Sequence, residues 1–412
     1  MKQRAVITGL GVLAANGIGL DAFWESLLAG RSGIAEITLF DTTDFPVKIA
    51  GEIKGFDVNA FVPAEMKPQR MGRHTHLAIA AAKMAIEHAR LSHEELEALQ
   101  PVPLFLGVST SAIDVLERGK ERMIKLGPRK VSPFVVTASQ PQAVASALGE
   151  ALRLQLQSMT VSSACSAGLQ AVAAAMDHIA SGRGPLILTG GVDAPITPYT
   201  VASFGASKLI EAVPGDPSKI SRPFDRDRTG GVMAEGAGML VLESLDHARA
   251  RGATIWAEIR GHATAGDPRG GHSGDGFRET MRLALANALC MPADIDYICA
   301  HGPSDPEIDI VETEAIKFVF GEHAHRIPVS SIKGCTGNPL SAAGPLQIAA
   351  AAMALRTGIV PPTANHEHPD LRCDLDYVPG RPRHLALRRA LVNVHGLGGG
   401  NTSLVLERVA GS

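Results

Sequence analysis

The residue best suited to covalent chemistry is Cys165. A β-prone run at residues 158–162 leads into small residues and the cysteine, and an Ala-rich segment without proline follows at residues 169–179. This order predicts a strand, a tight turn and a helix that is buried on nearly all sides. A thiol at the first turn of such a helix lies at the positive end of the helix dipole, which favours the thiolate and hence a nucleophile. The alternative is a small core cysteine, because free cysteines are commonly buried.

A candidate acid–base residue, His301, follows another predicted strand. It comes directly after the strand-like run at residues 297–300 and precedes an acidic helix start that contains Asp309 and Glu312. Open α/β folds place ligand chemistry at this position, just beyond the carboxyl end of a strand.

Two loops rich in glycine carry the remaining candidates. Residues 329–344 repeat the strand–loop–helix order seen around Cys165 and contain Lys333 and Asn338. Residues 393–401 contain a run of glycines, which would let backbone N–H groups approach a substrate oxygen without hindrance from side chains.

Short apolar runs alternate with Ala- and Leu-rich helical stretches along the whole chain. Strands are expected at residues 5–8, 104–108, 159–162, 185–188, 238–242, 255–261, 297–300, 327–330, 390–394 and 403–407, and helices at residues 76–89, 169–179, 278–289, 312–320 and 346–355. Continuous apolar strands between helices predict α/β sheets that are covered on both faces. The pattern occurs twice, so we expect two related halves, residues 1–247 and 248–412, joined by a charged helical segment at residues 244–254.

Composition limits the classes of function. The 412 residues are 45% hydrophobic and 20% charged, which is enough for a sizeable core. A net charge of -3 gives no overall attraction to nucleic acid or to anionic membranes. The five cysteines form no CxxC pair, which favours a reducing compartment. Without a signal peptide or an apolar run of about 18 residues, we expect a cytoplasmic globular protein that binds neither nucleic acid nor membrane.

Two short patterns resemble cofactor or metal sites but have simpler structural explanations. Gly9 and Gly11 lack the third glycine and the later acidic residue of a dinucleotide fingerprint, so close packing or a tight turn explains them. His366 and His368 alternate before a proline in a loop, which is a weak arrangement for a metal. We therefore expect no metal site.

The motifs taken together resemble the β-ketoacyl-acyl-carrier-protein synthases, in their elongating type II class. The matching motifs occur in order over almost the whole chain, at residues 6–11, 128–134, 221–225, 234–238, 361–363 and 373–379. This resemblance implies the thiolase-like α/β fold, with duplicated βαβαβαββ halves in a five-layered αβαβα core. It also implies acyl transfer from the phosphopantetheine of an acyl carrier protein to the cysteine, then decarboxylative condensation with a malonyl thioester. The phosphopantetheine belongs to the partner, and no resident cofactor is implied.

The resemblance assigns a role to each candidate. Cys165 corresponds to the nucleophile, and its N–H and that of Leu397 to the oxyanion hole. His301 corresponds to the histidine that hydrogen-bonds the malonyl thioester carbonyl. Lys333 and Glu312 correspond to a lysine and its acidic partner, and Asp309 lies in the same loop. The alternative for these charged residues is a structural ion pair that orders the loops.

Other positions correspond to binding surfaces. Phe204 would line the acyl pocket. Residues 110–150 contain no clear strand and carry a basic face, which indicates a surface excursion or a solvated charged loop. A basic rim that docks the acidic carrier protein corresponds to Lys67, Arg70, Arg129, Lys130 and Lys208.

One departure from the family pattern affects the catalytic set. The second histidine of the family is Asn338 here. An amide can donate a hydrogen bond to a carbonyl oxygen but cannot exchange a proton near neutral pH. The set Cys165–His301–Asn338 resembles the Cys-His-Asn set of initiating and chalcone-synthase-like condensing enzymes, so condensation remains chemically open.

Further departures surround the predicted substrate tunnel. Pro303 and Asp305 replace two threonines that hold pantetheine, His395 and Leu397 replace the bulky gate of the last loop, and residues 229–231 replace an Asp-Gly-Phe sequence. This concentration of changes favours a specialised synthase of a polyketide, polyene or unusual-lipid pathway. We also hypothesise that His395 supplies the missing imidazole near the nucleophile.

Three alternatives remain. The first is a non-elongating acyltransferase that loads Cys165 but passes the acyl group to another acceptor. The second is a non-catalytic partner like the chain-length factors, which generally lack the cysteine. The third is a thiolase acting on coenzyme A, which needs a second cysteine that the loop at residues 396–400 lacks. The family is usually homodimeric, and a heterodimer with a related subunit is the other expected assembly.

Overall fold

Two sets of five strands carry the core of the chain. The computed structural model describes residues 3–210, 214–268 and 273–409. The first set consists of β1 (Ala5–Ala14), β5 (Val102–Val108), β6 (Leu156–Val161), β7 (Leu186–Asp193) and β8 (Gly236–Ser244), and the second of β9 (Ala257–Gly266), β10 (Tyr297–Cys299), β11 (Val329–Ser330), β14 (Arg389–Gly396) and β15 (Gly400–Glu407). The strand orders are β6-β5-β7-β8-β1 and β11-β10-β14-β15-β9.

The two sets share one topology. In the first, β5 pairs in parallel with β6 and β7, and β8 pairs antiparallel with β7 and β1. In the second, β10 pairs in parallel with β11 and β14, and β15 pairs antiparallel with β14 and β9. Residues 5–7 of β1 also pair with residues 257–259 of β9, which joins both sets into one hydrogen-bonded sheet. The repeated order confirms the expected duplication.

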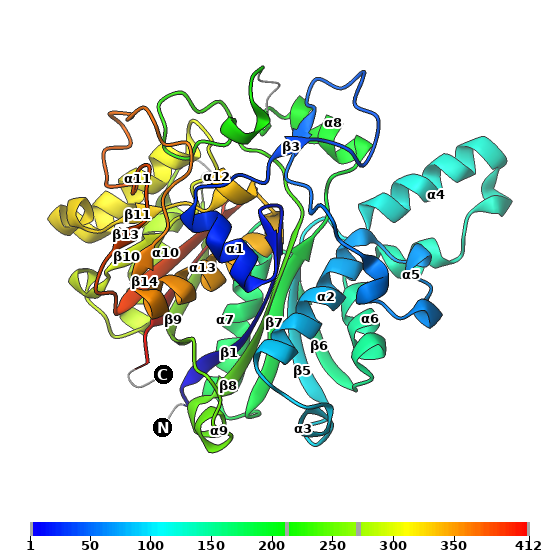
Figure 1. Cartoon of the computed structure of the whole chain (residues 1–412), viewed down its shortest axis with the longest axis horizontal. Coiled ribbons are helices and arrows are strands. Elements are labelled where there is room, and N and C mark those ends of the chain that lie inside the picture. Colours follow the sequence, from blue (N-terminus) through cyan, green and yellow to red (C-terminus); the bar gives the residue numbers. More distant parts are fainter. Residues whose placement is uncertain (1–2, 211–213, 269–272, 410–412) are drawn as a thin grey trace.

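Helices cover both sets of strands and separate them (Figure 1). On the first outer face lie α2 (Arg73–His88) and α6 (Ala143–Leu152), and on the second lie α10 (Asp275–Asn287) and α11 (Ile308–Phe320). Between the sets lie α7 (Ala167–Ala180) and α13 (Ala343–Thr357), each of which contacts strands of both. Each half therefore follows the order βαβαβαββ, and the layers follow αβαβα, as the family resemblance implied.

Small residues let the two inner helices approach closely. Residues 343–355 of α13 are all buried. A Cβ on Gly168 would lie 2.0 Å from the carbonyl oxygen of Ser341, and a Cβ on Gly344 would lie 2.6 Å from the Cβ of Leu169. Larger side chains at these positions would force the helices apart, so the Ala- and Gly-rich sequence positions Cys165 at the start of α7.

The expected strands and helices are all present, with shifted ends. β1 continues to Ala14 instead of ending at residue 8, and β7 continues to Asp193 instead of ending at residue 188. Glycines inside these strands concealed their length, because glycine disfavours a strand unless another element packs closely against it. A Cβ on Gly11 would lie 1.9 Å from the carbonyl oxygen of Ala81 in α2, which supports close packing as the explanation for that motif.

The remaining elements connect and flank this core. The helices are α1 (Leu20–Leu28), α3 (His93–Glu97), α4 (Ile113–Leu126), α5 (Phe134–Ser139), α8 (Pro198–Ala206), α9 (Leu245–Ala250) and α12 (Lys333–Thr336). The short strands are β2 (Gly17–Ile18), β3 (Ala35–Glu36), β4 (Ile49–Ala50), β12 (Ile359–Val360) and β13 (Arg383–His384). Residues 110–150 form helices and no strand, and α4 extends away from the body (Figure 1). The expected domain boundary at residues 247 and 248 falls inside α9 and stays a prediction.

A membrane-crossing element is missing from the described part of the chain. None of the helices within residues 3–210, 214–268 and 273–409 combines the length and the apolar character that a membrane span requires.

Candidate active site

Cys165 lies in a tight turn between β6 and α7, as its sequence predicted. Ala164 adopts a left-handed conformation with φ 53°, which is strained for a residue with a side chain. The hydroxyl of Ser166 donates a hydrogen bond to the carbonyl of Ser163 at 2.7 Å and closes the turn. The cysteine is 7% exposed, so the turn delivers a nearly buried thiol to the start of α7.

Two backbone N–H groups lie beside this thiol. The N–H of Leu397, in the loop between β14 and β15, and the N–H of Cys165 itself both donate toward the sulfur. Burial raises the pKa of the Cys165 thiol, while these N–H groups and the positive charge of Lys333 oppose the increase. Because burial outweighs them, the resting thiol stays protonated near neutral pH, and the helix N-terminus alone does not make it a thiolate.

His301 is held from behind by Lys333. The Nζ of Lys333 lies 3.1 Å from Nδ1 of His301 and also donates to the carbonyl oxygen of His301. An ammonium group can only donate, so Nδ1 accepts and the neutral ring carries its proton on Nε2. Burial, Lys333 and His395 lower the pKa of His301 well below its usual value, and burial lowers the pKa of Lys333 to about 8. The pair therefore presents a neutral imidazole.

Glu312 supports the same loop through its backbone. Its carboxylate accepts hydrogen bonds from the N–H of His301 at 2.9 Å and of Gly302 at 2.8 Å, and from the side chain of Asn393 at 3.2 Å. Among the described ion pairs there is none between Glu312 and Lys333. Glu312 still acts on Lys333 through its charge, which raises the pKa of Lys333 against the effect of burial. Both residues also hold His301 through hydrogen bonds.

Asp309 has a structural position. Its carboxylate accepts a hydrogen bond from the N–H of Phe224 at 2.7 Å and lies 3.6 Å from Nε of Arg228. Burial raises the pKa of Asp309 to about 8, and Arg228 opposes this increase. The residue ties α11 to the loop at residues 222–228 and does not line the cavity described next.

A cavity of about 160 Å³ brings most of the predicted site together. Its lining includes Cys165, Phe204, His301, Pro303, Asp305, Asn338, His395 and Leu397. The lining also includes Leu209, Ile210, Gly231, Val232, Met233, Ile308, Leu340 and Gly398. Apart from Gly231 and Gly398, which lies in the predicted glycine run, the sequence assigned no residue of this second group to the site, because most of them are apolar. Their only signal was a position in or near the stretches that carry Phe204, residues 229–231, His301 and Asn338.

Asn338 occupies the position of the second histidine of the family. Its backbone is fixed by hydrogen bonds to the carbonyl of Val232 at 2.7 Å and from the N–H of Ala234 at 3.0 Å. Its side-chain Oδ1 is buried and has no hydrogen-bond partner among the described residues. A buried polar atom without a partner costs free energy, so this oxygen would accept a hydrogen bond from a group that enters the cavity. A carbonyl oxygen of a substrate would instead need the NH₂ group of the same amide as donor.

Asp305 caps a helix as well as lining the cavity. Its Oδ1 accepts hydrogen bonds from the N–H groups of Glu307 and Ile308, each at 2.9 Å. These are orphan donors at the first turn of α11. The carboxylate is therefore partly committed to fold stability, which the sequence analysis did not foresee when it assigned the charge to the tunnel alone.

The predicted docking residues are all exposed. Lys67, Arg70, Arg129 and Lys130 lie near the α4–α5 excursion, where the Arg70 guanidinium stacks over the ring of Phe134 at 4.1 Å. Lys208 directly follows α8, next to the cavity-lining Leu209. α8 begins beside α4, where the hydroxyl of Thr197 contacts the carboxylate of Glu117, and Lys208 lies beyond the other end of α8 (Figure 1).

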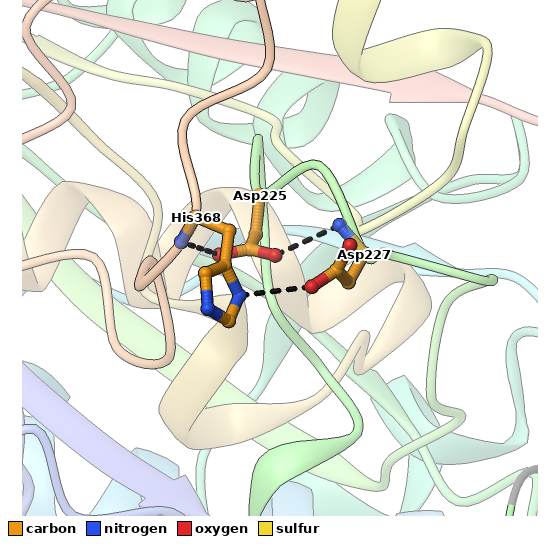
Figure 2. A group of neighbouring side chains, drawn as sticks. All are labelled: Asp225, Asp227 and His368. Atoms are coloured by element: carbon orange, nitrogen blue, oxygen red, sulfur yellow. Dashed lines mark hydrogen bonds and ion pairs between the residues drawn. The ribbon is translucent and has the colours of Figure 1, made fainter.

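The loop containing His368 joins another part of the chain (Figure 2). The buried carboxylate of Asp225 accepts hydrogen bonds from the N–H groups of Asp227 and His368, and Nδ1 of His368 lies 2.8 Å from Oδ2 of Asp227. These contacts already account for the arrangement of the three residues. His366 lies apart, stacked on Tyr377, so the two histidines do not act together.

The fold and the cavity define a class of protein. A nucleophilic thiol between two duplicated half-sheets, beside a histidine held by a buried lysine, is the arrangement of a condensing enzyme of the thiolase-like type. The chain belongs to the β-ketoacyl synthase family. Residues 2–248 match the family description "Beta-ketoacyl synthase, N-terminal domain", and residues 256–367 match "Beta-ketoacyl synthase, C-terminal domain".

Individual relatives support this membership over the full length. The 3-oxoacyl-[acyl-carrier-protein] synthase 2 of Synechocystis sp. is 38% identical, over 99% of this chain and 98% of that protein. The solved ishigamide ketosynthase/chain length factor has a TM-score of 0.92 at 32% identity and covers 100% of both chains. A type II polyketide ketosynthase, solved with its acyl-carrier protein and bound to the hexaketide, has a TM-score of 0.91 at 30% identity, over 99% of this chain and 100% of that chain.

Proposed function

We propose that this chain is a β-ketoacyl-acyl-carrier-protein synthase. It takes an acyl group from the pantetheine thiol of an acyl carrier protein onto Cys165 and then condenses that group with malonyl carried by the same type of partner. The observation that carries the proposal is the convergence of Cys165 and the Lys333-held His301 on one cavity. Acyl transfer needs the thiol, and decarboxylative condensation needs a donor beside it.

The first step uses the turn at Cys165. The sulfur attacks the thioester carbonyl, a bond forms between Sγ and the acyl carbon, and the bond from that carbon to the pantetheine sulfur breaks. Negative charge develops on the carbonyl oxygen, and the N–H groups of Cys165 and Leu397 lie where they can stabilise it. The product is an acyl thioester on Cys165 and a free pantetheine thiol.

The second step uses His301 and Asn338. Loss of carbon dioxide from the malonyl group leaves an enolate on its thioester oxygen, and Nε2–H of His301 donates to that oxygen. The amide of Asn338 supplies a second donor but no proton. The enolate carbon then attacks the acyl carbon on Cys165, and release of the thiolate completes the new carbon–carbon bond.

The surroundings of the cavity favour a specialised substrate. Gly231 and Leu397 leave the cavity without the aromatic rings expected from the family pattern. Pro303 and Asp305 offer no hydroxyl to a pantetheine arm. We therefore place the enzyme in a polyketide, polyene or unusual-lipid pathway, working in the cytoplasm as a homodimer or with a related subunit. The proposed reaction needs no resident metal or organic cofactor.

Docking of the carrier protein uses the exposed basic residues. Lys208 lies beside the cavity lining, so we assign it to the entry of the pantetheine arm. The basic residues near α4 and α5 serve steering, which depends on the distribution of charge and not on the net charge of -3.

A second candidate is an acyltransferase that does not elongate. The loss of the second histidine at Asn338 favours it, and the retained Lys333–His301 contact opposes it. Intact mass spectrometry separates the candidates when the protein is incubated with acyl-carrier protein and then with malonyl-carrier protein. Discharge of the Cys165 adduct as a β-ketoacyl product supports the synthase, and a persistent adduct supports the acyltransferase. If the wild-type protein forms no adduct, and so behaves like Cys165→Ala, the result would support a non-catalytic partner.

A further inference from the structure

The inner helix α13 carries one polar side chain in the middle of its buried stretch. Residues 343–355 are all buried, and Gln347 has the only polar side chain among them. Its exposed fraction is 0%. An amide that is buried without hydrogen-bond partners costs free energy, so the partners of Gln347 indicate what it holds in place.

The NH₂ group of Gln347 lies against the backbone where two strands separate. Its nitrogen donates to the carbonyl oxygens of Ala300 at 2.8 Å, Asn393 at 3.0 Å and Cys299 at 3.2 Å. The parallel ladder between β10 and β14 stops at Cys299. The amide therefore satisfies carbonyl groups just beyond the last ladder pair, beside the loop that carries His301.

These contacts fix the orientation of the amide. Carbonyl oxygens only accept, so the NH₂ group must face them, and Oε1 is left for a donor. That donor is Nζ of Lys333, which lies 3.5 Å from Oε1. The other two contacts of Nζ are Nδ1 of His301 at 3.1 Å and the carbonyl oxygen of His301. Within the described part of the chain, the three hydrogens of the ammonium group thus have three acceptors, and all three acceptors are uncharged.

Charged groups act on Lys333 without touching its ammonium group. Burial is the largest influence and lowers the pKa of Lys333 to about 8. The groups that oppose burial through their charge are Glu312, Cys165, Cys299 and Asp309. Among the described hydrogen bonds and ion pairs, none joins Nζ to these four groups. The imidazoles of His301 and, beyond it, His395 complete the surroundings. The direct support of the ammonium group therefore comes from His301 and Gln347.

We propose that Gln347 is a positioning residue for condensation: it holds Nζ of Lys333 against His301 and, because its amide is neutral, it sets the alkaline limit of this step. Gln347 is not part of the described cavity lining, so it acts through Lys333 on the tautomer of His301. No bond forms or breaks at the amide. This inference rests on the proposed function, because it concerns the condensation step.

Two substitutions of similar length should move this limit in opposite directions. The wild-type rate should decline above about pH 8, where Lys333 loses its charge. Gln347→Glu places an opposite charge beside Nζ, which favours the ammonium form, so the decline should begin about one pH unit higher. Gln347→Met offers only a weak acceptor, so the ammonium group loses a partner and the decline should begin about half a pH unit lower.

The test is single-turnover condensation of acyl-loaded enzyme with malonyl-carrier protein between pH 6.5 and 9.5. Acylation of Cys165 in the same samples is the internal reference, because its oxyanion donors are backbone N–H groups that neither variant alters. Met353→Leu, on the same helix, keeps the side-chain volume and should match wild type in both steps. If one Gln347 variant fails to fold, which would also abolish acylation, the direction of the shift in the other decides.

Two results would contradict the inference in different ways. A wild-type enzyme that forms the Cys165 adduct but never condenses it with malonyl-carrier protein would overturn the proposed function together with this inference. If wild-type condensation is observed, an alkaline limit that is the same in wild type and both Gln347 variants, or that moves in one direction in both, would overturn the role of Gln347 alone.

Discussion

Nζ of Lys333 lies 3.1 Å from Nδ1 of His301, and this contact sets the direction of every hydrogen bond that His301 can offer to a substrate. The ammonium donates, the ring nitrogen accepts, and the proton of the neutral imidazole is left on Nε2. The lysine therefore acts through the histidine, as a positioning residue for the condensation step.

Replacing this lysine should separate the two half-reactions. In Lys333→Met the side chain keeps its length but loses the donor, so His301 can change tautomer and lose its Nε2 proton. We expect decarboxylation of malonyl-carrier protein to fall about 100-fold, measured as release of labelled carbon dioxide. Acylation of Cys165 should change far less, because the oxyanion N–H groups are backbone groups. Equal losses in both steps would indicate a general structural role instead.

The contact between Lys333 and His301 predicts how the rate of condensation depends on pH. Burial lowers the pKa of Lys333 to about 8, so the ammonium is complete below that value and is lost as the pH rises through it. Condensation by an enzyme already loaded with acyl groups should therefore decline above about pH 8. Single-turnover rates between pH 6.5 and 9.5 measure this, with thermal unfolding as a check on integrity. A rate that keeps rising to pH 9.5 would contradict the assigned direction.

Asn338 should matter as a donor and not as a proton carrier. Asn338→Asp is nearly the same shape but offers no N–H when ionised, so condensation should fall about 100-fold, measured with malonyl-carrier protein and acyl-loaded enzyme. Asn338→His, which restores the family residue, is the matched control and should retain activity. If Asn338→Asp condenses as fast as wild type, the amide has no role in holding the enolate.

Gly231 should set the width of the cavity. A Cβ at this position would lie 3.2 Å from the carbonyl oxygen of Pro303 and 3.5 Å from that of Leu209, so a larger side chain has to enter the cavity. Gly231→Phe should shift the preference toward shorter acyl groups, measured by competition among acyl-carrier proteins of graded length. Gly231→Ala adds only the Cβ and should shift it less. An unchanged preference in Gly231→Phe would place the acyl chain elsewhere.

Local sequence patterns predicted the elements and the reactive residues that follow them. The strand, turn and helix around Cys165 and the strand end before His301 each depend on a short continuous stretch, so their patterns are visible without the fold. Motif order then predicted that these stretches meet, and the shared cavity of Cys165, His301, Asn338 and Leu397 agrees with this prediction.

Local sequence patterns could not predict contacts between segments that are distant in sequence. The hydrogen bond from Asn401 to Asp267 crosses 134 positions in sequence, and the tie between Asp225 and His368 crosses 143. The capping role of Asp305 was missed for a different reason, since the start of α11 lies earlier than periodicity indicated. The lengths of β1 and β7 could not be predicted, because glycines inside a strand are favourable only where a helix packs closely against them.

The central claim is that Cys165 and the Lys333-held His301 act on one substrate in sequence. The most direct measurement is a single turnover in which acyl-loaded enzyme is mixed with labelled malonyl-carrier protein and the carrier protein is analysed by mass. We predict a labelled β-ketoacyl group on the carrier protein, with the Cys165 adduct lost at the same rate. An adduct that persists while malonyl-carrier protein stays intact would contradict the account.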